Sequence, residues 1–332
     1  MQPRLPVAAS PKGTNVNYVT EAGIQVFYER LLATLEAAGV PVVILGGQAM
    51  LRHRLAETTK DADLFVRADH FAPFLQVLAE SRYLGVAPVY RTVVSAPLAR
   101  PWANGGWGAH FEYPVERGPR PRLDILARPP RIDPEELPRH GVAPLFLLAE
   151  TKKTRREAKD WGQVATLGHL LLDAGDSRGL LLIQNGEELI ERLRELPPDE
   201  QLIERRPNLR LAWQVSDRLG AALETEQRFW RHFDAVRWSV FTQASRDYAL
   251  AVRRQEQDRP SDLFGQHEWL VRIAADRLPG DPLGEHGIDA LFDEASRRAL
   301  LGYPLEFAEF LPPRSVVLQP WKTNPKPPAP AA

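Results

Sequence analysis

The sequence predicts an α+β protein in two parts, a mixed sheet with flanking helices followed by a mainly helical domain. Short runs rich in β-branched and aromatic residues occur only before Pro144. From Leu145 to about Gly302, apolar residues recur with a 3.6-residue period that glycines and prolines interrupt. A chain of 332 residues is also longer than one small core requires. We therefore place a domain boundary near residues 139–144.

The composition shifts along the chain divide it into four segments. Both ends of the chain contain several prolines at irregular spacing, and such stretches favour extended conformations over packing. The predicted segments are a loose N-terminal arm (1–17), the sheet-containing core (18–140), the helical domain (141–312) and a Pro-rich C-terminal tail (313–332).

Within the core, the hydrophobic pattern predicts an alternation of helices and strands. The helix at 69–81 is expected to be capped by Asp69, because aspartate accepts hydrogen bonds from the first backbone N–H groups of a helix. Ten prolines between Pro97 and Pro144 predict turns and extended loops there, without helices. The predicted helices are 23–39, 48–55 and 69–81, and the predicted strands are 41–45, 61–66, 87–96, 107–115 and 122–127.

The composition excludes several classes of protein. With 44% hydrophobic and 26% charged residues the chain is not disordered throughout, and without cysteine it has no disulfide, thiolate nucleophile or cysteine-ligated metal. A formal net charge of −1 excludes a nucleic-acid coat protein. No apolar run of 18 residues occurs, so we expect a soluble cytoplasmic protein that does not contact a membrane.

The densest chemical signal lies between Val42 and Val66. A short strand leads to Gly46 and Gly47, where a helix begins, and a second strand starts with Asp61 and Asp63. Because side chains alternate along a strand, the two carboxylates face the same side and can share a divalent cation. Glycines at the start of a helix let backbone N–H groups approach a phosphate. The unit therefore predicts a site for a metal-bound phosphate substrate.

A third carboxylate is expected on a neighbouring strand, because a second metal ion needs its own ligand to activate an attacking hydroxyl. Asp124 is the candidate, since it alternates with Leu123 and Ile125 in an otherwise apolar strand. Alternative interpretations are a solvated turn for Asp61 and Asp63, and an edge strand with Asp124 paired to Arg122.

These residues together resemble a known family. They look like the signature of the DNA polymerase β-type nucleotidyltransferases, which consists of Gly46-Gly47, then Thr59-x-Asp61-x-Asp63, then an aspartate in a later short strand. The subgroups most similar to this chain are bacterial abortive-infection and MenT-type toxin nucleotidyltransferases and related transferase-fold proteins. The resemblance covers roughly residues 24–172.

The resemblance implies a nucleotidyltransferase core and a set of site residues. Asp61, Asp63 and Asp124 would hold two Mg²⁺ ions, and Gly46, Gly47 and Thr59 would contact the phosphates of a nucleoside triphosphate. The enzyme would transfer a nucleoside monophosphate to an acceptor hydroxyl, which we expect on a tRNA or a protein. A toxin–antitoxin or defence system, with an antitoxin or defence partner, would be its context.

A second match lies between Ala149 and Gln163. Toxin-type relatives carry a lysine early in a helix and a basic-Asp pair later, which fits Lys152 or Lys153 and Lys159-Asp160. We expect Lys152, Lys153 and Arg156 to bind the triphosphate, with Asp160 orienting them. In one continuous helix Lys152, Arg155, Arg156 and Lys159 would share a face, which is either a phosphate or RNA site or a solvated surface.

One departure from the family pattern keeps other functions open. Many relatives carry an arginine where this chain has Glu57, and Arg52 or Arg54 would have to compensate. The alternatives are a transferase fold that binds a nucleotide or partner without turnover, and a nucleic-acid-binding module.

The remaining chemical residue types predict no further site. The eight histidines lack metal-ligand spacing. Trp102 and Trp107 flank Gly105-Gly106 in a loop that either covers a base or packs a turn. Aromatic residues in the helical half recur at helical spacing, so we expect them in the core, with base stacking as the alternative; they are Trp230, Phe233, Trp238, Phe241 and Tyr248.

Overall fold

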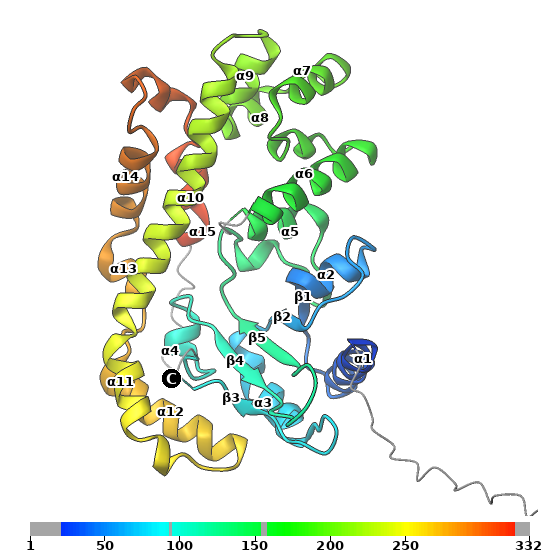
Figure 1. Ribbon diagram of the computed structural model, residues 1–332, viewed down its shortest axis with the longest axis vertical. Helices are drawn as coiled ribbons and strands as arrows, with labels where there is room; N and C mark the ends of the chain where they lie inside the picture. Colours follow the sequence, from blue (N-terminus) through cyan, green and yellow to red (C-terminus); the bar gives the residue numbers. More distant parts are fainter. Residues whose placement is uncertain (1–20, 93–94, 154–157, 323–332) are drawn as a thin grey trace, which may run out of the picture.

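The computed structural model describes residues 21–92, 95–153 and 158–322. A mixed sheet occupies one side of the molecule, and a long layer of helices stands beside it (Figure 1). This confirms the α+β class and the order of the two parts. In the part of the chain that the structure describes, no helix combines the length and the apolarity that crossing a bilayer requires.

Six strands form one sheet in the order β3-β4-β5-β2-β1-β6. The central strands β2 and β5 run parallel, as do β1 and β6, whereas the other neighbours are antiparallel. Because β5 lies inside the sheet, the edge-strand interpretation of Asp124 is wrong. The strands are β1 (Val43–Leu45), β2 (Asp61–Phe65), β3 (Val89–Tyr90), β4 (Ala109–Glu112), β5 (Arg122–Leu126) and β6 (Gly141–Val142).

Short helices and turns connect these strands. The first helix is followed by Gly39 in a left-handed conformation, which is the usual way in which a glycine ends a helix. The elements are α1 (Glu21–Ala37), α2 (Gly46–Arg52), α3 (Phe71–Glu80), α4 (Arg100–Ala103), and the 3₁₀ turns η1 (Ala68–His70) and η2 (Pro134–Glu136).

The two faces of the sheet have opposite character. Leu64, Leu123 and Phe111 point to the face that packs under the first helices and are buried. Residues one position away point to the other face, where Asp63 and Asp124 lie. The strand alternation therefore separates an apolar core from a polar surface within the same sheet.

The helical half begins at Leu145, and several of its interruptions fall at glycines and prolines, whereas those between α9 and α10 and between α10 and α11 do not. The α-helices are α5 (Leu145–Lys152), α6 (Ala158–Asp173), α7 (Gly186–Glu195), α8 (Glu200–Arg205), α9 (Asn208–Trp213), α10 (Leu219–Ala244), α11 (Arg246–Arg254), α12 (Leu263–Arg277), α13 (Pro282–His286), α14 (Ile288–Ala299) and α15 (Arg314–Lys322). Three 3₁₀ turns join them: η3 (Ser177–Leu181), η4 (Glu256–Asp258) and η5 (Leu305–Phe310).

Several local predictions for the core are wrong. The strand predicted over 87–96 is reduced to two residues, and positions 93 and 94 lie outside the described residues. Asp69 does not cap α3, because the chain enters that helix through the turn η1 and the N-cap residue is His70. Helix α4 forms in the proline-rich stretch, where Pro101 occupies a first-turn position that needs no N–H donor.

The predicted segment boundaries also shift. Strand β6 pairs with β1, so the sheet extends past residue 140 into the segment assigned to the helical domain. The predicted Pro-rich tail begins with helix α15, whose Val317 and Leu318 are buried in an apolar cluster with α10 and α14. Packing of these two side chains outweighs the extended preference of the prolines, and Pro320 lies inside the helix.

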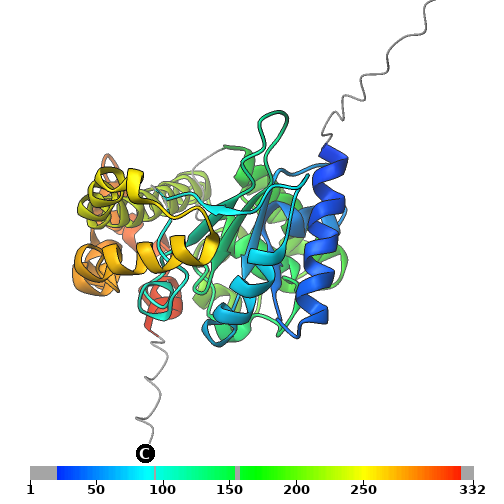
Figure 2. The same cartoon turned by 90° about the horizontal axis from the view of Figure 1, so that it is seen from below.

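Helix α12 returns to the sheet and packs against its edge strand β3 (Figure 2). The Trp102 indole nitrogen donates to the Leu278 carbonyl at 3.0 Å, and that of Trp107 donates to the Pro279 carbonyl at 2.8 Å. Gly105 lies directly against the Gly280 backbone, where a side chain would collide. The Trp–Gly-Gly–Trp loop therefore packs a turn and joins the two halves of the molecule.

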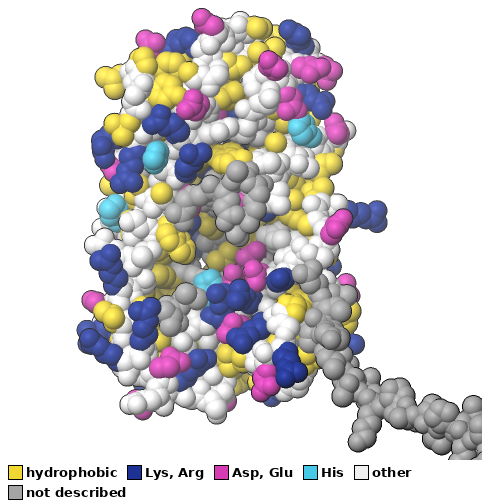
Figure 3. All heavy atoms as spheres, viewed as in Figure 1, with side chains coloured by type: hydrophobic (Ala, Val, Ile, Leu, Met, Phe, Trp, Pro, Cys, Tyr) yellow, Lys and Arg dark blue, Asp and Glu magenta, His cyan; other side chains and the backbone are white. Residues whose placement is uncertain are grey.

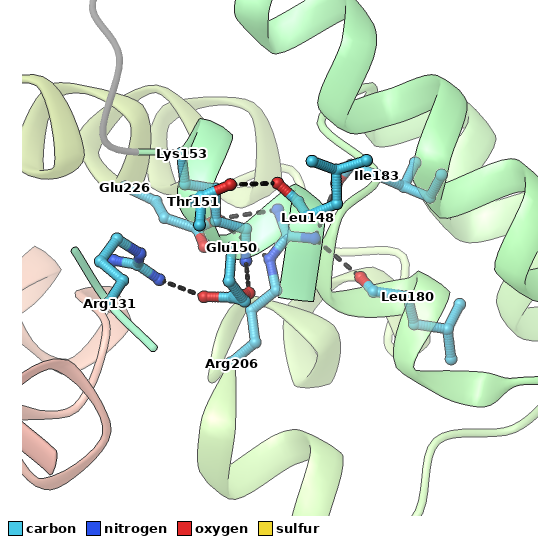
Figure 4. Close-up of polar contacts among 9 residues, drawn as sticks. All are labelled: Arg131, Leu148, Glu150, Thr151, Lys153, Leu180, Ile183, Arg206 and Glu226. Carbon is cyan, nitrogen blue, oxygen red and sulfur yellow. Dashed lines mark hydrogen bonds and ion pairs between the residues drawn. The ribbon is translucent and has the colours of Figure 1, made fainter. Parts of the chain in front are cut away.

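A buried ionic cluster joins the sheet region to the first helices of the helical half (Figure 4). Glu150 of α5 accepts a hydrogen bond from Arg131 and another from Lys153, each at 2.6 Å. Burial alone would raise the pKa of Glu150, but the charges of Lys153 and Arg131 outweigh it and lower the pKa to about 2. Nearby, Arg206 binds Glu226 at 2.8 Å and caps the carbonyl groups of Leu180 and Ile183.

Substitution Glu150→Gln should lower the free energy of unfolding by about 3–5 kcal/mol at pH 7, because two cations lose their buried counter-charge. The folded pKa lies below the ordinary value, so this contribution is present above about pH 4.5 and is lost as the pH falls towards 2. Urea unfolding at several pH values measures it. The difference in the free energy of unfolding between wild type and Glu150→Gln should shrink on acidification. A difference that stays constant with pH would contradict the account. The control is Glu29→Gln, at an exposed position.

Candidate functional site

A cleft of about 590 Å³ lies between the polar face of the sheet and helices α10 and α11. Figure 3 shows acidic, basic and histidine side chains gathered around a hollow near the middle of this face of the molecule. The volume is within the range of pockets that bind small molecules. The cleft therefore brings residues of both halves of the chain into one site.

Asp63 and Asp124 form the floor of this cleft. They are Cα partners in the parallel pairing of β2 with β5, so their carboxylates stand side by side on the same face. His110 of the neighbouring strand β4 has its Nδ1 atom 2.7 Å from Asp124 Oδ1. Arg91, which follows β3, has its Nη1 atom 3.7 Å from the same oxygen. Asp124 thus faces the cleft as predicted, with basic groups beside it.

The two glycines are required by the side chains that approach them. Gly46 has a positive φ of 55°, and a Cβ there would collide with Asp63 Oδ2. A Cβ on Gly47 would lie 2.5 Å from Thr59 Oγ1. Of these, Gly46 and Asp63 line the cleft, whereas Gly47 and Thr59 do not. The structure therefore places Asp63 directly against Gly46, and Thr59 directly against Gly47.

Asp61 occupies a different position from the other two acids. It shares their sheet face, but it is exposed at the first residue of β2 and does not line the cleft. Among the described residues, no group of three or more His, Asp or Glu side chains is close enough to hold a metal ion by protein ligands alone.

Of the predicted cationic face, the structure describes the side chain of Lys152 alone. Lys152 Nζ donates to Gln163 Oε1 at 2.6 Å, whereas eleven residues of continuous helix would separate them by about 16 Å. Helices α5 and α6 pack against each other. Arg155 and Arg156 and the side chain of Lys159 lie outside the described residues.

The structure distinguishes between the two candidate lysines. Lys152 lines the cleft, whereas Lys153 does not line it and lies in the buried cluster with Glu150. Asp160 also lines the cleft and is 4% exposed. Its Oδ2 accepts no hydrogen bond from any residue that the structure describes. A buried carboxylate oxygen in this state is open to a cation or to a donor on a ligand.

Arg52, Arg54 and Glu57 lie outside the cleft. All three side chains are exposed. The positive charges that do line it are Lys152, Arg128 and Arg237, which come from α5, from the segment after β5 and from α10.

The second wall of the cleft is a continuous stripe on α10 and α11. Its residues follow the helical period of i, i+3, i+4 and i+7 and combine charged, hydroxyl and aromatic side chains. Most of its aromatic residues are buried as the pattern predicts, but Trp238 is 55% exposed. The stripe consists of Asp234, Arg237, Trp238, Phe241, Thr242, Ser245 and Tyr248.

Several of these residues were absent from the sequence-based site. His110, Arg128, Asp234, Arg237 and Trp238 all line the cleft. Only His110 carried a usable signal, because it alternates with Ala109 and Phe111 in a predicted strand. Arg128 lies just beyond the end of β5, and placing Asp234, Arg237 and Trp238 requires the packing of the later helices against the sheet.

The cleft offers three kinds of interaction to one ligand. Two neighbouring carboxylates supply hard oxygen ligands, three basic side chains supply positive charge, and exposed aromatic surface supplies a face for a planar group. Comparison of the chain with models of known protein families, with curated proteins and with solved structures found no match in any of the three.

Substitution Gly46→Ala should destabilise the fold by about 1–3 kcal/mol, because it places a side chain at positive φ and against Asp63. Urea unfolding measures the effect. The matched control is Gly162→Ala in α6, where a Cβ meets nothing within 4 Å and alanine should stabilise by about 0.5–1 kcal/mol. Equal stability of Gly46→Ala and wild type would show that the close approach of Asp63 is absent in solution.

Proposed function

We propose that the protein is a magnesium-dependent nucleotidyltransferase with a polymerase β-type core, whose active site is the cleft above β2 and β5. The observation that supports this most is the in-register pair of Asp63 and Asp124 on the floor of a cavity of about 590 Å³. The substrate would be a nucleoside triphosphate, and the acceptor a hydroxyl group of a macromolecule such as tRNA or a protein.

The donor set fits Mg²⁺. This ion prefers carboxylate oxygens and usually keeps waters and substrate phosphates among its six ligands, so two carboxylates are sufficient protein ligands. Asp63 and Asp124 supply them, and Asp61 approaches the same sheet face from the exposed start of β2. When bound, the metal neutralises the phosphates and favours the ionised acceptor hydroxyl.

The surrounding residues position the substrate in this proposal. Lys152 and Arg128 place positive charge along the cleft, where the triphosphate would lie. The buried Asp160 lines the same cleft as Lys152. His110 holds the Asp124 carboxylate through its Nδ1 atom. Gly46 allows the Asp63 carboxylate to lie against the backbone.

A second candidate function is nucleotide binding without turnover. Glu57 and the exposed positions of Arg52 and Arg54 favour it, because the arginine of many relatives has no substitute from this segment. Such a protein would use the same cleft as a nucleotide sensor or as part of a toxin–antitoxin or defence assembly. Binding and transfer must therefore be measured separately.

Transfer should depend on the two cleft aspartates. Incubation of the protein with Mg²⁺, each α-labelled nucleoside triphosphate and total cell extract should place label on RNA or protein, and Asp63→Asn or Asp124→Asn should reduce it by at least about 100-fold. Asp217→Asn, an exposed residue on the surface of the helical half, is the control. Transfer that survives both cleft substitutions would contradict the proposal.

Nucleotide binding should require the metal. A nucleoside triphosphate should raise the melting temperature in Mg²⁺ but not in excess chelator, because a ligand that binds only the folded state stabilises it. A rise in melting temperature without any transfer in the first assay would favour the second candidate function. Stabilisation that is the same with and without chelator would argue against a metal-bound substrate.

A further inference from the structure

We infer that Trp238 is the platform on which the nucleobase stacks, and that the stripe on α10 therefore holds the nucleoside while the sheet holds the phosphates. This inference rests on the proposed function, because it assigns the two ends of a nucleotide to the two walls of the cleft. Trp238 lines the cleft from the wall opposite to Asp63 and Asp124.

The exposure of Trp238 is the first observation. Its neighbours in the aromatic pattern, Trp230, Phe233 and Phe241, are at most 7% exposed, whereas Trp238 is 55% exposed. Its ring contacts no other aromatic ring or cation in the part of the chain that the structure describes. An indole held at a cavity wall with a free face is a ready surface for a planar ligand.

The polar group beside it is the second observation. Arg237 donates from Nη2 to Asp234 at 2.7 Å, and its side chain is only 13% exposed. Its Nε is buried and finds no acceptor among the described residues. Buried donors are normally satisfied, so this N–H would be stabilised by an acceptor that a ligand brings against it, such as a base carbonyl, a ring nitrogen or a ribose hydroxyl.

The other aromatic side chains near this wall of the cleft are held by packing contacts and hydrogen bonds. Trp107 is fixed edge-on against Phe241, with ring centroids 4.8 Å apart, and its indole nitrogen is bonded to Pro279. Tyr248 is bonded to the Ser95 carbonyl at 2.9 Å. Both aromatic groups are therefore committed to packing, and Trp238 is the exposed ring on this stripe.

The test compares ligands with and without a base. Equilibrium binding of each of the four nucleoside triphosphates and of inorganic tripolyphosphate is measured in Mg²⁺ by calorimetry. Trp238→Ala should weaken binding of the nucleotides by about tenfold or more and leave tripolyphosphate unchanged. Trp238→Phe should restore most of the affinity, because it retains an aromatic face.

Trp213 provides a matched control. It is also a half-exposed tryptophan, on α9, and does not line the cleft. Trp213→Ala should therefore bind every ligand as wild type does. Unchanged nucleotide affinity in Trp238→Ala, or equal weakening of nucleotide and tripolyphosphate, would overturn the inference while the proposed function stands. A wild-type protein that binds neither ligand would overturn the proposed function itself.

Discussion

The parallel pairing of β2 with β5 is the constraint on which the rest of the site depends. It places Asp63 beside Asp124 in one register, on the face of the sheet that the first helices leave uncovered. A shift of one residue would turn either carboxylate into the apolar face, where Leu64 and Leu123 now lie. Tyr28 fixes the start of this pair, since its hydroxyl lies 2.7 Å from the Lys60 carbonyl and 2.9 Å from the Arg122 nitrogen.

The helical half completes the site by returning to the sheet. Hydrogen bonds from Trp102 and Trp107 to the end of α12, and from Tyr248 to Ser95, hold α10 and α11 opposite the acidic floor. The cleft therefore combines two walls of different chemistry that come from distant parts of the sequence. The buried cluster around Glu150 links the same two regions on the other side and leaves Lys152 directed into the cleft.

The sequence predicted the local parts of this arrangement and not the long-range ones. Gly46 and Asp63 were predictable because a strand, a glycine turn and a second strand follow one another within a short segment. Asp124 was predictable because a charged residue alternating with buried leucine and isoleucine needs a polar face. The different positions of Lys152 and Lys153 were not predictable, because they depend on the burial of Lys153 in the ionic cluster with Glu150 and Arg131. Trp238 was assigned to the core with its neighbours, since a helical period does not reveal which face meets a cleft.

The most direct test of the account is a crystal structure of the protein with Mn²⁺ and a nucleoside triphosphate analogue that cannot be cleaved between the α- and β-phosphates. The account predicts an anomalous metal peak in contact with the carboxylates of Asp63 and Asp124, and triphosphate density that extends from it towards Lys152. Metal and nucleotide bound elsewhere, with those two carboxylates free of both, would contradict it.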